Sequence, residues 1–234
     1  FYPEGGGQIG DTGKLISLAD EIQVIDSYKD SGDIIHLTKK LPSNLESQVK
    51  LKVATKRRSL IEANHTGTHL LHQALRNILG DHVEQRGSMI SDEMFRFDFS
   101  HPSKLSSSDL NSINSFVNSK IKESIPLVEN REEDYETAIN NGAIGLFTEK
   151  YEDKVRTVKF DESYELCGGT HAKNTSKLKT FSIISEVSQA FGIRRITATC
   201  NEEIILKELE KKKASKEKAV NEKANKELKK EIEL

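Results

Sequence analysis

Short stretches of alternating hydrophobic and polar residues open the chain, and glycine-rich turns separate them. Such alternation over a few residues is typical of a half-buried β-strand. The pattern therefore predicts a small β unit over residues 1–55, with strands at residues 14–16, 22–25, 34–37 and 49–53.

A helical period replaces this alternation at about residue 59 and continues to Leu79, where Gly80 offers a helix end. Three histidines, His65, His69 and His72, lie on one side of this helix. Apolar residues lie on roughly the opposite side, at Leu70, Leu71, Ala74, Leu75 and Ile78. We expect the apolar face to pack against the core and the histidine face to carry the chemistry.

Strand and helix patterns then follow each other up to residue 200. Helices are predicted from the N-cap Ser106 to about Ser124, and over residues 131–140. Strands are predicted at residues 83–90, 94–99, 126–130, 155–160, 164–166, 179–187 and 193–200, the last two joined as a hairpin through residues 189–192. These elements indicate an α+β core over residues 56–200, built from a mixed, mostly antiparallel sheet with packed helices.

The composition changes after Cys200. Residues 201–234 contain ten Lys and nine Glu, and they lack Gly, Pro and aromatic residues. This composition predicts one long exposed helix, the start of a linker or coiled coil. Its apolar positions are sparse for a coiled-coil seam, so we expect a solvated helix, with self-association through it as the alternative.

Charge and cysteine content narrow the class of protein. The net charge is −2 over 234 residues, so any contact with a nucleic acid must come from a local patch. Two cysteines are too few for a disulfide framework and favour a reducing cytoplasm. We find no apolar run long enough to span a bilayer, and we expect no membrane partner. The chain lacks an initiating Met and opens inside a motif, so we expect it to be part of a longer protein.

Two pairs of side chains have the spacing of metal ligands. His65 and His69 lie four residues apart on the predicted helix, and Cys167 and His171 are four apart in a glycine-rich segment. Together they predict a zinc site. His171 is either a fourth ligand or a base beside the ligands, so the site is either closed and structural or open and catalytic. His72 is expected to be a polar neighbour of the ligands.

The histidines and the N-terminal glycines do not indicate a metalloprotease or a dinucleotide-binding protein. The residues between His65 and His69 lack the glutamate of an H-E-x-x-H metalloprotease. Gly5, Gly7 and Gly10 satisfy G-x-G-x-x-G, but no strand precedes them, so we interpret them as tight turns.

Several separate motifs occur in the order typical of one family. They are residues 1–13, Asn64 to His72, Gln85 to Ser88, Arg96 to His101, Leu146-Phe147 with Glu149-Lys150-Tyr151, and Glu165 to His171. In these motifs the chain resembles the editing region of the alanyl-tRNA synthetases. The resemblance implies hydrolysis of Ser or Gly wrongly esterified to tRNA(Ala), with Zn²⁺ as cofactor and an aminoacylation domain elsewhere in the same protein.

The resemblance also implies roles for individual residues. Gln85, Thr66 and Thr68 are the candidate catalytic residues, beside the zinc ligands His65, His69, Cys167 and His171. Contacts to the substrate are expected from Gln8, Gly168, Gly169 and Thr170. Contacts to tRNA phosphates are expected from Arg57, Arg58, Arg194 and Arg195, with Lys56 beside them; surface ion pairs would explain these cations equally well.

Three other interpretations stay open. The chain is a freestanding editing protein of the same family, a zinc-stabilised RNA-binding module without turnover, or a scaffold organised by its C-terminal helix. Removal of zinc would unfold the second of these rather than only inactivate it. Truncation at Cys200 would abolish association of the third.

Overall fold

The computed structural model describes residues 1–145 and 151–232, so the motif residues Leu146-Phe147 and Glu149-Lys150 lie outside the described residues. Two compact units make up the chain, Phe1–Asn201 and Glu202–Leu234. Antiparallel sheets and helices build the first unit, and one helix builds the second. The predicted α+β class is confirmed, while the division at residue 55 stays a prediction.

A four-stranded antiparallel sheet follows the glycine-rich start, in the order β3-β2-β1-β4. The strands are β1 (Gly13–Ile16), β2 (Glu21–Asp30), β3 (Asp33–Thr38) and β4 (Lys50–Val53). Leu15 pairs with Ile22 on one side and Leu51 on the other, so the three apolar side chains share one face. All four predicted strands are confirmed.

The glycine-rich segment before β1 is hydrogen-bonded to the strand that follows the histidine helix. Ile9 N donates to Ile90 O at 3.1 Å, and Ile90 N donates to Gly7 O at 2.7 Å. Gly7 has a φ of +82°, and a Cβ there would lie 2.6 Å from Ser88 O. Only glycine permits this close backbone approach, as the tight-turn interpretation expects.

Two further antiparallel sheets form the core, in the orders β10-β11-β6-β5 and β7-β8-β9. Their strands are β5 (Gln85–Ile90), β6 (Phe95–Ser100), β7 (Val128–Asp134), β8 (Lys154–Phe160), β9 (Ser163–Leu166), β10 (Ser182–Ala190) and β11 (Ile193–Thr199). The expectation of one mixed sheet here is therefore corrected. Neighbours occupy both edges of the central strands β6, β11 and β8, so these strands cannot join the two sheets.

Helices α1 (Thr55–Leu79) and α2 (Ser107–Lys122) confirm the two long helices predicted in the core, although α1 begins at Thr55 rather than at residue 59. Ser106 caps α2 as predicted, and Asp109 completes a reciprocal capping box. A short 3₁₀ helix, η1 (Thr175–Leu178), follows β9.

The helix predicted over residues 131–140 is shorter than expected. Helix α3 spans only Tyr135–Asn140, because residues up to Asp134 continue β7 and pair with β8. Asp134 is the N-cap of α3, and its carboxylate accepts a hydrogen bond from Thr137 N at 3.0 Å. An N-cap residue has an extended backbone, so the chain before it is free to remain in the strand.

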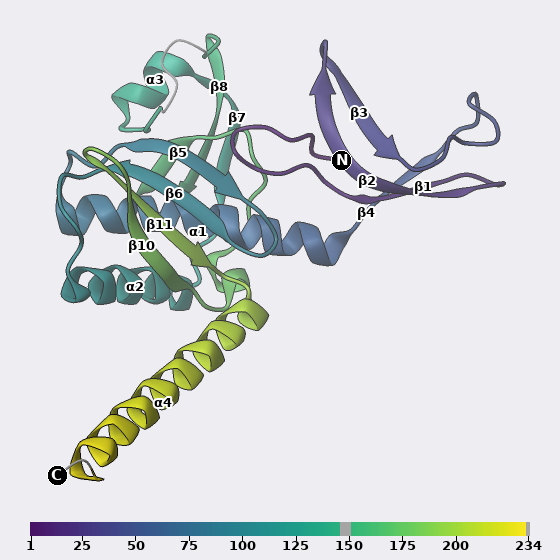
Figure 1. Cartoon of the computed structure of the whole chain (residues 1–234). Coiled ribbons are helices and arrows are strands. Elements are labelled where there is room, and N and C mark those ends of the chain that lie inside the picture. The colour runs from purple at the N-terminus through teal and green to yellow at the C-terminus, as the bar shows by residue number, and fades with distance from the viewer. Residues whose placement is uncertain (146–150, 233–234) are drawn as a thin grey trace. The chain divides into compact units, whose positions relative to one another are not determined.

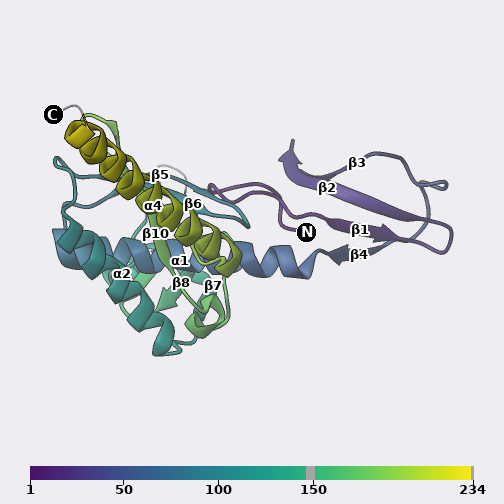
Figure 2. The same cartoon turned by 60° about the horizontal axis from the view of Figure 1, so that its bottom comes forward.

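Helix α1 is the centre of the core. It contacts β5, β6, β9, α2 and η1, and Figures 1 and 2 show it running through the first unit beside α2. Its apolar face packs, as expected, with three phenylalanines of β6 in one hydrophobic cluster, and of the face only Ile78 is partly rather than fully buried. The histidine face is buried too, so any chemistry there takes place inside the protein.

The second unit is helix α4 (Glu202–Ile232), which confirms the helix predicted from composition. The side chains described between residues 202 and 218 are mostly exposed, and Glu208 and Lys211 form an ion pair at 2.6 Å. Among the described residues, no helix is both long enough and apolar enough to cross a membrane.

Candidate metal centre

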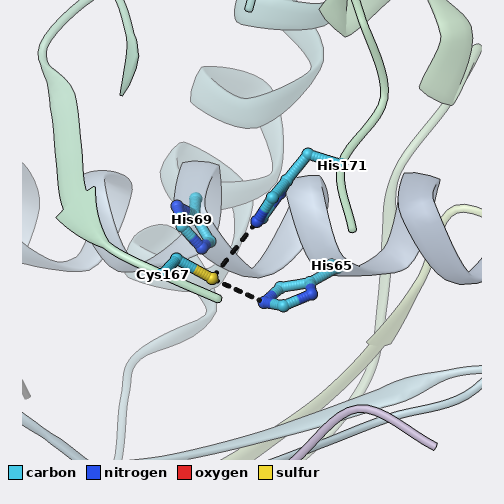
Figure 3. A group of neighbouring side chains, drawn as sticks. All are labelled: His65, His69, Cys167 and His171. Atoms are coloured by element: carbon cyan, nitrogen blue, oxygen red, sulfur yellow. Dashed lines mark hydrogen bonds between the residues drawn. The ribbon is translucent and has the colours of Figure 1, made fainter. Parts of the chain in front are cut away.

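Four side chains that are distant in the sequence meet beside α1. His65 and His69 extend from adjacent turns of the helix, Cys167 follows β9, and His171 lies in the loop between β9 and η1. Their candidate ligand atoms all lie within 4.8 Å of one another. Figure 3 shows the three imidazoles around the thiol, whose Sγ lies 3.4 Å from His65 Nε2 and 3.2 Å from His171 Nε2. The two predicted pairs therefore form one cluster.

The spacing of these atoms fits a tetrahedral metal site. Zinc lies about 2.0–2.1 Å from an imidazole nitrogen and about 2.3 Å from a thiolate, so neighbouring ligand atoms are about 3.3–3.7 Å apart. The distances from Cys167 Sγ to His65 Nε2 and His171 Nε2, 3.4 and 3.2 Å, are at or slightly below that separation, and the four candidate ligand atoms spread over up to 4.8 Å. Side-chain movements of about 1 Å would bring all four atoms to tetrahedral spacing.

Burial sets the charge state of the cluster. It lowers the pKa of His65 and His171 well below 6.5, and neighbouring histidines and Arg156 lower it further. Burial also lowers the pKa of His69, although the carboxylate of Glu165 opposes this shift. Burial raises the pKa of the Cys167 thiol to about 12. The imidazoles are thus neutral at pH 7, while the thiolate form of Cys167 requires a cation beside it.

Gln8 fixes the orientation of His65. Its Oε1 accepts hydrogen bonds from Thr170 N at 2.9 Å and from His65 Nδ1 at 2.7 Å, and its Nε2 donates to Thr170 Oγ1 at 3.0 Å. Since Nδ1 of His65 donates to Gln8, Nε2 has its lone pair free and faces Cys167. The glycine-rich segment thus reaches the metal cluster through a fully buried side chain.

The threonines on α1 have different surroundings. Thr66 Oγ1 lies 3.3 Å from His171 Nδ1 and accepts a hydrogen bond from Ala172 N at 3.1 Å, so this hydroxyl positions the His171 loop. Thr68 Oγ1 donates to Asn64 O at 2.9 Å, and Thr68 lines the cavity described below. Their proposed catalytic roles stay predictions.

One buried carboxylate lies behind the cluster. Glu165 Oε1 accepts a hydrogen bond from His72 Nδ1 at 3.0 Å, and its Oε2 lies 3.7 Å from His69 Nδ1. Burial alone would raise the pKa of Glu165, but the two histidines outweigh that effect and hold it below 4.5. His72 is therefore a polar neighbour of the ligands, as expected.

Arg156 holds the loop that contains Cys167. Its guanidinium donates to the carbonyl oxygens of Cys167 at 2.5 Å and Gly169 at 2.7 Å, and it pairs with Glu129 at 3.0 Å. Gly169 packs against His65 so closely that a Cβ would lie 2.0 Å from His65 Cε1. The loop conformation and the position of His65 therefore depend on each other.

A cavity of ≈ 700 Å³ adjoins the cluster. His65, His69 and Cys167 line it, together with Gly168 and Gly169. Gln85 lines it as well and donates to Ser88 Oγ at 3.3 Å. The lining carries charges of both signs and aromatic surface: Lys29, Lys154 and Arg156, Glu4, Glu152 and Glu165, and Tyr2 and Tyr151. The volume of the cavity exceeds that of a single amino acid, and the cluster forms part of its wall.

Acidic partners engage all four arginines considered for tRNA contact. Arg57 pairs with Asp92 and donates to Gly10 O, and Arg58 forms a two-point ion pair with Asp11. On the core sheet Arg194 pairs with Glu186, and Arg195 pairs with Asp98 through two hydrogen bonds of 2.6 and 2.7 Å. Their contact with tRNA stays a prediction.

The sequence analysis gave no role to Arg156, Glu129 or Glu165. A signal for Glu165 was present in the sequence, because it lies two residues before Cys167 at the end of a predicted strand, and residues two apart on a strand face the same side. Arg156 had none, because its place beside Cys167 depends on the register between β8 and β9.

Comparison with known proteins finds relatives of this chain. Residues 155–197 match the family model described as the threonyl and alanyl tRNA synthetase second additional domain. The chain is 52% identical over 203 residues to an alanine–tRNA ligase of Christiangramia forsetii. This alignment covers 86% of this chain and 23% of that protein. It is 46% identical over 213 residues to the Flavobacterium psychrophilum alanine–tRNA ligase, with 87% and 24% covered. The Bacteroides fragilis alanine–tRNA ligase is 48% identical over 198 residues, with 85% and 23% covered.

The chain therefore spans about a quarter of the length of these curated relatives. The similarity extends well beyond the 43 residues of the family model, since each alignment covers at least 85% of the chain. On this evidence the chain belongs to the alanine–tRNA ligase family, as a segment that contains the second additional domain.

Proposed function

We propose that the chain hydrolyses the ester bond of mischarged tRNA(Ala), releasing Ser or Gly, as the editing part of an alanine–tRNA ligase. The observation that carries the proposal is the His65–His69–Cys167–His171 cluster in the wall of a ≈ 700 Å³ cavity. Because the chain belongs to the alanine–tRNA ligase family, we take an aminoacyl ester of tRNA(Ala) as the substrate of this cavity.

A synthetic site for alanine needs such a correction. A pocket that accepts a methyl group also accepts the smaller glycine, and it rejects an added hydroxyl only weakly. A second site that hydrolyses the wrong ester restores accuracy. In this proposal the aminoacylation domain lies elsewhere in the same protein, so this chain alone has no ATP-dependent activity.

The cofactor in this proposal is zinc. Three neutral imidazoles and one thiolate are a preferred donor set for Zn²⁺. When bound, zinc supplies a Lewis acid that holds the thiolate form of Cys167 and polarises oxygen or nitrogen groups of the substrate.

The side chains around the cavity then bind and orient the ester. Gln85 and Thr68 lie on the cavity wall, where a hydroxyl of a seryl group or an attacking water requires hydrogen-bond partners. Gly168 and Gly169 leave room for the ester beside Cys167, with Thr170 fixed behind them by Gln8. In this proposal Arg57, Arg58, Arg194 and Arg195 contact the phosphates of the acceptor arm.

The test is the rate at which the zinc-loaded chain releases serine from seryl-tRNA(Ala), compared with alanine from alanyl-tRNA(Ala). We expect faster release of serine, and loss of that release in Cys167→Ala. Cys200→Ala is the matched control, because Cys200 is buried against Gly67 and is not part of the cluster. Release at the uncatalysed rate by a zinc-loaded chain that binds the tRNA would refute the proposal.

A second candidate function follows from the number of ligands. Four protein donors are typical of a closed structural zinc site, which would make the chain an RNA-binding module without turnover. The two functions differ in their response to a chelator. A structural site loses its fold together with the metal, whereas an editing site loses hydrolysis first and keeps its secondary structure.

A further inference from the structure

A buried carboxylate that contacts two histidines lies behind the metal cluster, and neither the family match nor the metal motif assigns it a role. His69, His72 and Glu165 are each at most 4% exposed. An ionised carboxylate in such a place is costly unless hydrogen bonds and a counter-charge compensate it. The described contacts supply only part of that compensation, so the remaining charge requires an explanation.

The geometry supplies the hydrogen-bonding part. His72 Nδ1 lies 3.0 Å from Oε1 of Glu165, and this bond orients the carboxylate. The other oxygen, Oε2, then lies 3.7 Å from Nδ1 of His69. His69 Nδ1 is buried and has no hydrogen-bond partner among the described residues. A small rotation of the imidazole or the carboxylate would form the missing bond.

The other two imidazoles of the cluster already have such a partner. Gln8 Oε1 lies 2.7 Å from Nδ1 of His65, and Thr66 Oγ1 lies 3.3 Å from Nδ1 of His171. In metal sites the second ring nitrogen of a histidine ligand is commonly held in this way, which fixes both the tautomer and the ring orientation. His69 is the one histidine of the cluster whose outer group is a carboxylate.

Charge balance supports the same assignment. Three neutral imidazoles and one thiolate leave a divalent cation with a net charge of +1 in a buried place. The carboxylate of Glu165 would bring that charge to zero, and its own burial would then be compensated by the cation. Arg156 and Glu129 add a nearby pair of opposite charges that cancel each other.

From these contacts we propose that Glu165 is a positioning residue of the metal centre, which orients His69 as a ligand and neutralises the bound cation, while His72 holds Glu165 in place. The proposal rests on the metal site of the proposed function. It assigns Glu165 and His72 to metal binding and not to the hydrolysis itself.

Glu165→Gln separates this role from a merely structural one. Glutamine keeps the shape of the side chain and can still accept a hydrogen bond from His72, but it lacks the charge. We expect zinc affinity, measured by competition with a chromophoric chelator, to fall about 10- to 100-fold. We expect the metal-free chain to stay folded with a modestly lower melting temperature, because glutamine keeps the hydrogen bond from His72 but loses the charge that the histidines stabilise. His72→Asn should weaken zinc binding less, since His72 acts only through Glu165.

A control variant is Thr175→Val. Thr175, the first residue of η1, is fully buried; its Oγ1 donates to Lys120 O of α2 at 2.7 Å and accepts a hydrogen bond from Ile125 N at 2.8 Å. We expect it to lower the melting temperature of the metal-free chain and to leave zinc affinity within about twofold of wild type.

The outcomes are distinguishable. A wild-type chain that binds no zinc would refute the metal centre and this inference together. A wild-type chain that binds zinc, with Glu165→Gln binding it equally well, would refute only the inference. The inference also fails if Glu165→Gln behaves like Thr175→Val, with a lower melting temperature and normal affinity. Cobalt substitution adds a second measurement, because a reoriented His69 would change the visible absorption of bound Co²⁺.

Discussion

Gly169 leaves no room for a side chain at the metal cluster. A Cβ at this position would lie 2.0 Å from His65 Cε1 and 2.9 Å from Gln8 Oε1. Overpacking in a buried site costs about 1–3 kcal/mol and displaces the neighbouring groups. We therefore expect Gly169→Ala to move His65 and to weaken zinc binding at least tenfold. This loss corresponds to about 1.4 kcal/mol of binding free energy, and chelator competition measures it.

Gly168 provides the matched control. A Cβ there would have no neighbour within 4 Å, and the residue lies next to Gly169 in the same loop. Gly168→Ala should therefore bind zinc within about twofold of wild type. Equal affinity of the two variants would show that His65 does not depend on the close approach of the loop.

Metal binding should release one proton from the chain at pH 7 to 8. The imidazoles of His65, His69 and His171 have lowered pKa values and are already neutral, so they release none. The thiol of Cys167 has a pKa of about 12 and must lose its proton to bind. Because a higher pH makes that loss easier, affinity should rise about tenfold per pH unit in this range.

Calorimetry in buffers of different ionisation enthalpy counts the released proton directly. The wild-type chain should release one proton per zinc bound, and Cys167→Ala should release none from the protein. Release of two protons would mean that a histidine of the cluster is charged before zinc binds. That result would contradict the effect of burial on the imidazoles.

The four residues of the cluster could be singled out from the sequence, because i, i+4 spacing on a helix and in a glycine-rich loop is a local pattern. The groups that orient the ligands were only partly predictable. Gln8 was expected near the substrate from the family resemblance, but its bond to His65 depends on how residues 1–13 fold against β5. Arg156 was missed because strand register is not a local property of the sequence.

At the scale of elements, the start of α2 allows a direct test of stability. Ser106 Oγ accepts from Asp109 N at 3.1 Å, and Ser106 N donates to Asp109 Oδ2 at 2.9 Å. Loss of an N-cap costs about 1 kcal/mol, within a range of about 0.5–2 kcal/mol. We expect Ser106→Ala to lower the free energy of unfolding by that amount in urea denaturation, without changing zinc affinity.

Ser108→Ala is the control for this change. Ser108 is exposed in the first turn of α2, where alanine has the higher helix propensity. This variant should unfold at the same urea concentration as wild type or slightly above it. Equal losses in the two variants would show that the capping box contributes nothing specific.

Single elements were predicted better than their assembly. Helix α1 and the strands β1 to β4 follow from local periodicity and turn residues, whereas the division of the core strands into two sheets follows from pairings between distant segments. Residues 131–134 show the same limit. Their composition favours a helix, but Glu133 and Asp134 pair with β8 after an irregularity at residues 131–132, and tertiary contacts override propensity.

At the scale of the whole molecule, every residue assigned to the metal centre lies in the first unit, Phe1–Asn201. A chain ending at Asn201 should therefore keep its melting temperature within about 2 °C and its zinc affinity within about twofold. It should also release serine from seryl-tRNA(Ala) at the rate of the full chain. Sedimentation of the same two proteins tests self-association through α4, which requires a concentration dependence in the full chain alone. A truncated chain that fails to fold or to bind zinc would show that α4 stabilises the editing unit.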